Sequence, residues 1–370
     1  MTEEVELSQK REELKRQLAA GEYRTLIDVI LDGTGRFIQK LTRRPEPPSF
    51  WFSMVAITLF YVSITVFISM LVGDTFETLI SFLGGVEYML LFVVSAVGLA
   101  IAIVMGYKIY IGAVFKTLHN HLLDAIELAT DLVDLQRWLV ALCNVKRTFF
   151  FSLAFGIVFG VYGPIVVAPI MEGFIGFGPL IMNMILDFQL GMMIYFLFLF
   201  LTLPIRLSRC QFKLYVANPS SSEVIDHLSD LLSNFVYLTA VVAALGALIL
   251  AFSGLLTLSI IITSVLMLWG PLIVLFIINQ YALSKIITRA KWRKLNEVQA
   301  KIEALETQED IPSEKTLGHL GKLMDYHDRI KATRNSALDL RAGLNFLNSL
   351  LIPLLAFILG NLDKVLDLFS

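Results

Sequence analysis

One uninterrupted run of helix-favouring sequence constrains this chain more than any other feature. Residues 255–281 are almost wholly apolar, and the basic residues 282–306 follow with no turn signal between them. At 1.5 Å per residue, a helix through both segments extends far beyond the ~30 Å hydrocarbon core of a bilayer. The pattern therefore predicts a rod that leaves a membrane and continues as a stalk. Ile311 and Pro312 then turn the chain back toward a last apolar segment, which begins at residue 344.

Several other apolar segments are long enough to cross a membrane, which takes about 20 residues. With 56% apolar and only 17% charged residues, the composition is typical of membrane proteins rather than soluble domains. The predicted spans lie at 50–73, 87–105, 149–170, 179–203, 235–252 and 255–281. We expect an all-α integral membrane protein of three in-out-in helical hairpins with a helical stalk. Residues 344–370 add either a seventh span or a re-entrant segment.

The basic residues indicate the orientation. Every Lys and Arg except Lys364 lies before the first span, between the second and third, between the fourth and fifth, or in the stalk. The three links on the other side contain none. By the positive-inside rule the N-terminus and the long loops are cytoplasmic. The acidic start of the chain lacks the order of a signal peptide, so we expect a multi-pass protein of the cell (inner or plasma) membrane.

Four regions follow from this layout. Residues 1–49 form two amphipathic cytoplasmic helices, whose apolar stripe either lies on the lipid or packs against protein such as the stalk. Residues 50–281 form the transmembrane domain, with cytoplasmic helices at 116–147 and 206–233. Residues 282–343 form a hairpin stalk, and 344–370 the C-terminal segment. The spacing of an antiparallel coiled coil appears at Leu295, Val298, Ile302, Leu305, Leu320, Leu323, His327 and Ile330.

Small residues four apart predict close helix contacts inside the membrane, either within the chain or between copies. They occur in the second, third and fifth spans, at Gly98, Ala102 and Gly106, at Ser152, Gly156 and Gly160, and at Ala243, Ala247 and Ala251. In the sixth span, Gly270 and Pro271 predict a kink that acts either as a hinge or as a static bend.

Asp187 is the ionisable residue that lies deepest in a predicted span, with Asn183 one turn earlier on the same face. Such a carboxylate either bonds to a neighbouring span or lines an ion path. Asn345, Asn348 and Ser349 of the C-terminal segment complete the pore or ion-path candidates.

No catalytic, cofactor or nucleic-acid motif is present, so we expect neither an enzyme nor a cofactor. His119 and His121 are two residues apart and face different sides of a helix, and no metal site is predicted.

The layout of seven spans with long cytoplasmic helices resembles that of insect chemoreceptor channels, and the resemblance covers the layout and no motif. It implies a last span that lines a shared pore. The leading hypothesis is a homo-oligomeric ion channel or channel-like sensor that assembles through its stalks. The alternatives are a membrane scaffold or sensor whose stalk recruits a cytoplasmic protein, and a secondary transporter that couples through Asp187.

Overall fold

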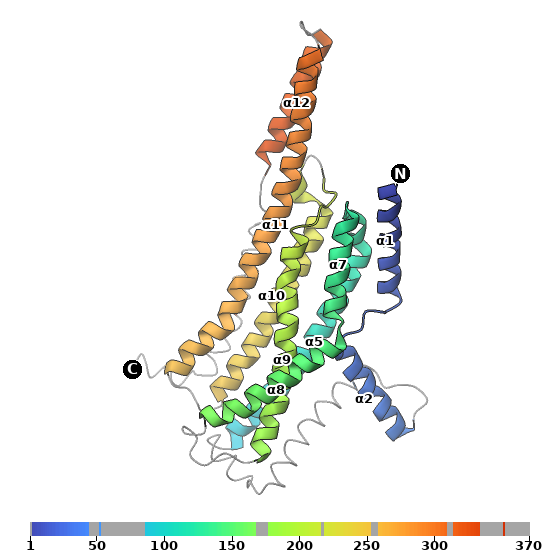
Figure 1. Cartoon of the computed structure of the whole chain (residues 1–370). Coiled ribbons are helices and arrows are strands. Elements are labelled where there is room, and N and C mark those ends of the chain that lie inside the picture. Colours follow the sequence, from blue (N-terminus) through green and yellow to red (C-terminus); the bar gives the residue numbers. More distant parts are fainter. Residues whose placement is uncertain are drawn as a thin grey trace.

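The computed structural model describes residues 2–43, 52, 86–167, 177–215, 218–252, 258–308, 314–333 and 351. Every regular element in these ranges is a helix, and the only extended pairing among them is an isolated bridge between Ile126 and Phe212. The helices form an elongated bundle, and the stalk extends from one end of it (Figure 1). The predicted first span at 50–73 lies outside the described residues except for Phe52, and so does the segment 344–370 except for Leu351.

The long helices of the bundle are α5 (Val86–Thr117), α8 (Val145–Val167), α9 (Phe177–Leu207), α10 (Glu223–Phe252) and α11 (Leu258–Gln308). Among the described residues, four helices are long and apolar enough to cross a membrane: α5, α9, α10 and α11. There are up to five if α7 (Ala129–Leu142) and α8, which meet at an angle of 49°, form one broken span.

The predicted cytoplasmic segments at 116–147 and 206–233 are each interrupted in the structure. The segment predicted as one helix at 116–147 is divided into a π-helix η1 (Leu118–Leu122), the short α6 (Leu123–Ala125) and α7. It breaks because Ile126 and Leu128 adopt extended backbone conformations and Ile126 pairs with Phe212. In the segment 206–233, α9 ends at Leu207 and α10 begins at Glu223 after a short 3₁₀ turn, η2 (Pro219–Ser221).

Aromatic side chains form the centre of the bundle. The ring of Tyr110 on α5 lies 4.8 Å from that of Phe200 on α9 and 4.9 Å from that of Phe235 on α10. Trp138 of α7 is fully buried beside them and donates its indole N–H to the Leu199 carbonyl at 3.0 Å. This cluster joins α5, α7, α9 and α10 through dispersion and one satisfied hydrogen bond.

The predicted small-residue contacts occur within the chain. A Cβ atom on Gly156 would lie 2.7 Å from the Met184 carbonyl oxygen, and one on Gly160 would lie 2.6 Å from the Met184 Cα atom. The backbones of α8 and α9 thus approach so closely that only glycine fits. Gly106 of α5 similarly faces Leu238 of α10, where Ala243 and Ala247 are buried.

Among the described residues, the N-terminal helices pack against the bundle and not against the stalk. Helix α1 (Thr2–Ala19) lies beside α6 and α7 and buries Leu14. Helix α2 (Leu26–Thr42) begins with a capping box between Thr25 and Asp28, and its first half packs near α5 and α8. Its second half leaves Phe37 and Leu41 exposed, at 64% and 74%.

The stalk consists of the end of α11 and of α12 (Glu314–Ala332), which lies alongside it (Figure 1). The predicted apolar row is confirmed in part: Leu295, Val298, Ile302 and Ile330 are buried, and Leu320 and Leu323 pack against them. Tyr326, rather than the predicted His327, completes this cluster, and Leu305 is not part of it. Lys291 is buried and donates to the carbonyls of Lys331 and Thr333 at 2.7 and 2.6 Å, which satisfies the end of α12. Helix α11 continues through Gly270 and Pro271 as one helix, with Pro271 inside it.

Candidate functional site

The residues that join the stalk to the bundle form the best-defined polar site, which we call the stalk junction: residues 125–131, 209–213, Arg289 and Arg293. Its base is the short pairing between the chain after α6 and the chain after α9. The Glu127 amide donates to the Gln211 carbonyl at 2.9 Å, and the Lys213 amide donates to the Ala125 carbonyl at 2.7 Å. These bonds hold two loops that are far apart in the sequence.

Two arginines of α11 fasten the stalk to this base. Arg289 Nη1 donates to the Arg209 carbonyl at 2.6 Å, and Arg293 Nη1 donates to Gln211 Oε1 at 2.9 Å. Arg293 also forms an ion pair with Glu127. A guanidinium group offers several donors in a fixed plane, which suits such a multiple contact. The root of the stalk is therefore bound to both loops at once.

Asp131 connects the junction to α7. Its Oδ2 accepts the Gln211 amide at 2.7 Å. Burial raises the pKa of the Asp131 carboxyl above its usual value, and the bond from Gln211 offsets part of that rise. The carboxylate thus fixes the loop after α9 to the first turn of α7.

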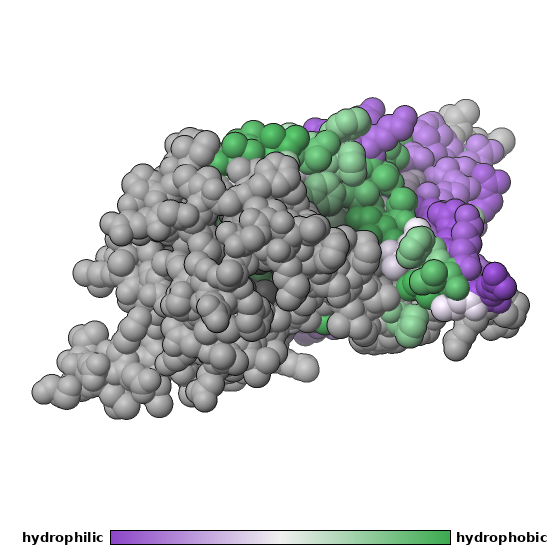
Figure 2. Space-filling view, turned by 90° about the horizontal axis from the view of Figure 1, so that it is seen from below, coloured by the Kyte–Doolittle hydropathy of each residue, from purple (hydrophilic) through white to green (hydrophobic). Residues whose placement is uncertain are grey.

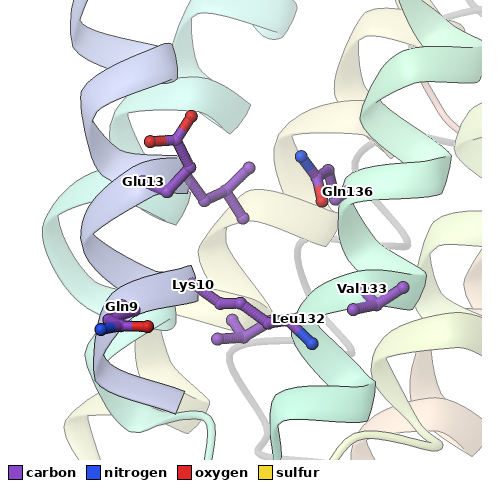
Figure 3. A pocket seen from close by; sticks show the side chains of 7 residues that line it. Gln9, Lys10, Glu13, Leu132, Val133 and Gln136 are labelled. Carbon is purple, nitrogen blue, oxygen red and sulfur yellow. The ribbon is translucent and has the colours of Figure 1, made fainter. Parts of the chain in front are cut away.

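Helix α1 contacts the other loop, at residues 123–126. Arg11 donates to the carbonyls of Leu123 and Ile126, both at 2.9 Å, and Lys15 pairs with Asp124 at 2.7 Å. Figure 3 shows the groove of about 300 Å³ between α1 and α7, lined by Gln9, Lys10, Glu13, Leu14, Leu132, Val133 and Gln136. Its lining mixes charged and apolar side chains, and Lys10 is paired with Glu6, so the groove offers no strong attraction to one class of ligand.

Helix α2 is fixed to the bundle by an ion pair between Asp28 and Lys108 of α5. Burial alone would raise the pKa of Asp28, but hydrogen bonds from Lys108 and Thr25 outweigh it and hold that pKa below its usual value. The carboxylate is therefore charged at neutral pH.

The predicted ion-path residues are only partly described. Asp187 is half-buried on α9, within the stretch that contacts α8, and no hydrogen bond or ion pair joins its carboxylate to another described residue. Asn183 lies on the same helix four residues earlier. Asn345, Asn348 and Ser349 lie outside the described residues, and Gly270 and Pro271 lie inside α11.

Two polar features escaped the sequence analysis. Asn279 of α11 is buried and donates to the Leu232 carbonyl of α10 at 3.2 Å. Its own Oδ1 and the neighbouring Gln280 Oε1 accept no hydrogen bond from the described part of the chain. The sequence signal for this feature was the pair of neighbouring amide side chains, Asn279 and Gln280, in an otherwise apolar segment. The second feature is the meeting of His121 with Glu223 and His227. Its signal was the four-residue spacing of Glu223 and His227, which places both side chains on one face of a helix.

Comparison with known proteins adds no relative, since no family model, curated protein or solved structure matches the chain. The function has to be argued from the geometry alone.

Proposed function

We propose that this protein is a multi-pass protein of the cell membrane that assembles through its stalk into an ion channel or channel-like sensor. The observation that carries the proposal is α11, a single helix of 51 residues. At 1.5 Å per residue it is about 75 Å long. It belongs to the bundle at one end and to the stalk at the other. A force on the stalk therefore reaches the bundle through one continuous helix. The stalk junction holds this helix where it leaves the bundle.

The surface of the bundle supports a lipid environment. Large apolar side chains point outward from several of the long helices, including Phe150 of α8 at 65% exposure, Phe198 of α9 at 62% and Ile277 of α11 at 58%. Seen from the end opposite the stalk, the described surface carries a broad hydrophobic area beside a hydrophilic edge (Figure 2). Soluble monomers rarely expose such large apolar patches. In our proposal lipid covers this area, six or seven spans cross the bilayer, and the stalk and N-terminus are cytoplasmic.

The outer face of the stalk supports self-assembly. Leu317 and Met324 are seven residues apart on α12 and are both about half exposed, and Trp292 of α11 is exposed at 57%. Seven residues return to the same helix face, so the two α12 side chains form a second apolar stripe. We propose that another copy of the stalk covers it. A cytoplasmic partner protein on the same stripe is the second candidate, and it would make the chain a membrane scaffold.

Two measurements on the purified protein distinguish these functions. The mass of the detergent-solubilised protein is expected to be a multiple of the 41.5 kDa chain, and single-channel recording in planar bilayers is expected to show discrete current steps. A strict monomer that stays silent over a range of pH and voltage would exclude the shared-pore channel. Silent oligomers whose stalk captures a cytoplasmic protein would favour the scaffold.

Asp187 tests the ion path. A carboxylate inside a span is costly unless it faces water or a partner, and no cation pairs with Asp187 in the described part of the chain. We expect Asp187→Asn to leave assembly intact and to lower cation over anion selectivity by about tenfold, which corresponds to ~1.4 kcal/mol of lost attraction. Gln189→Asn, on a different face of α9, is the control. Unaltered selectivity in Asp187→Asn would remove this residue from the path.

The orientation is tested by cysteine labelling. Cysteines placed at positions 81 and 175, which lie outside the described residues, are expected to react with a membrane-impermeant reagent applied to intact cells. A cysteine in place of Gln308 at the end of α11 is expected to react only after the membrane is opened. The native Cys143 and Cys210 are half-buried and buried, and the unmodified protein measures their background. The opposite labelling pattern would reverse the proposed topology.

A further inference from the structure

Three side chains of metal-binding type meet at the stalk end of the bundle. His121 lies in the π-helix η1, which continues α5, while Glu223 and His227 lie in the first two turns of α10. Single π turns within α-helices occur often at functional sites. Here the Leu123 amide donates to the Leu118 carbonyl across the wide turn, and both of the leucines that bound η1, Leu118 and Leu122, are fully buried.

The distances between the three groups suit a metal ion. One potential ligand atom from each residue lies within 4.8 Å of the other two. His227 Nε2 lies 3.4 Å from Glu223 Oε1, and the rings of His121 and His227 stack with their centroids 3.7 Å apart. Around a tetrahedral ion with bonds of about 2.1 Å, ligand atoms are ~3.4 Å apart. The pair on α10 already has that separation, and a ligand nitrogen of His121 lies within 4.8 Å of both.

We propose that His121, Glu223 and His227 bind a first-row transition-metal dication such as Zn²⁺. Two imidazoles and a carboxylate are a common set of three zinc ligands, and they leave a fourth position for water or another ligand. Imidazole nitrogen selects such metals over Mg²⁺ and Ca²⁺, which prefer oxygen. His121 and His227 are half-buried and Glu223 is exposed, so an ion reaches them from solvent. His119 does not belong to this cluster, and its Nδ1 contacts Asn120 Oδ1 at 2.7 Å.

The proposed ion would join the ends of two helices that pack along their length. Helices α5 and α10 already meet at Gly106 and Leu238 and in the aromatic cluster of Tyr110 and Phe235. The metal would add a link at the point where both helices leave the bundle. Binding is therefore expected to raise the thermal stability of the protein, because the ion binds the folded state in preference to the unfolded one. The site does not depend on whether the protein conducts ions.

The test uses the full-length protein without a histidine tag, purified in detergent and stripped of metal with a chelator. Titration calorimetry with Zn²⁺ is expected to give one ion per chain, and Zn²⁺ but not Mg²⁺ is expected to raise the melting temperature. Loss of a group that only orients a ligand weakens binding roughly 10–100-fold. We therefore expect His227→Ala, His121→Ala and Glu223→Gln each to weaken Zn²⁺ binding by at least about 100-fold.

His119→Ala is the matched control, two residues from His121, and it should bind Zn²⁺ like the unaltered protein. His227→Cys supplies a thiolate in place of the imidazole and should retain binding if it folds. Co²⁺ added to the metal-free protein should give the visible absorption bands of tetrahedral coordination, and His121→Ala should lose them. Absence of Zn²⁺ binding in the unaltered protein, or equal binding in His227→Ala and His119→Ala, would overturn the proposal.

Discussion

Replacing Gly160 by alanine is expected to lower the melting temperature of the protein, although alanine is the better helix former. The new methyl group would lie 2.6 Å from the Met184 Cα atom and 2.7 Å from the Met184 amide nitrogen. Backbone atoms cannot rotate away as a side chain can, so α8 and α9 must separate. Overpacking of this kind costs about 1–3 kcal/mol, and we expect the larger Gly160→Leu to prevent stable folding. Thermal unfolding in detergent measures both effects.

The control is the same substitution where there is space. Gly112 of α5 is exposed, and a Cβ atom there would meet nothing within 4 Å. Gly112→Ala is expected to stabilise the protein by up to ~1 kcal/mol through the higher helix propensity of alanine. The two variants should therefore shift the melting temperature in opposite directions. Equal shifts would mean that α8 and α9 are not in close contact at Gly160.

The features that depend on residues close together in the sequence were predictable from it. Helical spacing and apolar length located the long helices, as in the continuous run from the bundle into the stalk along α11. The small residues Gly156 and Gly160 indicated a helix contact, and the apolar row at Leu295, Val298 and Ile302 indicated the stalk hairpin. The periodicity of apolar and small residues indicates which face of a helix is buried. These predictions depended only on that periodicity and on the length of the apolar segments.

The predictions that failed depended on long-range pairing. The break after α6 arises because residues 125–127 bond to residues 211–213, and no local pattern announces a partner so far along the chain. The same limit hid the cluster of His121 with Glu223 and His227. The π turn that carries His121 also changes the helical register, so even a correct helix prediction would have misplaced its side chain.

Replacing Ile302 by aspartate is expected to open the stalk hairpin while leaving the bundle folded. Ile302 is 7% exposed and packs in the apolar row with Leu295, Val298 and Ile330. The substitution removes a buried apolar side chain and introduces a carboxylate with no cation in that row. Together these effects cost ~3 kcal/mol or more. The buried contacts of this row are few, so a loss of that size is enough to separate α12 from α11.

Limited proteolysis and the mass of the protein in detergent report the two consequences. In Ile302→Asp, cleavage within α12 should become faster and, if the stalk holds the copies together, the mass should fall toward that of one chain. Ala304→Asp is the control, because Ala304 is exposed on the same helix and its aspartate remains in water. A variant that is cleaved faster but keeps its mass would show that assembly depends on the bundle instead. Unchanged cleavage would mean that α12 is held by something other than the apolar row.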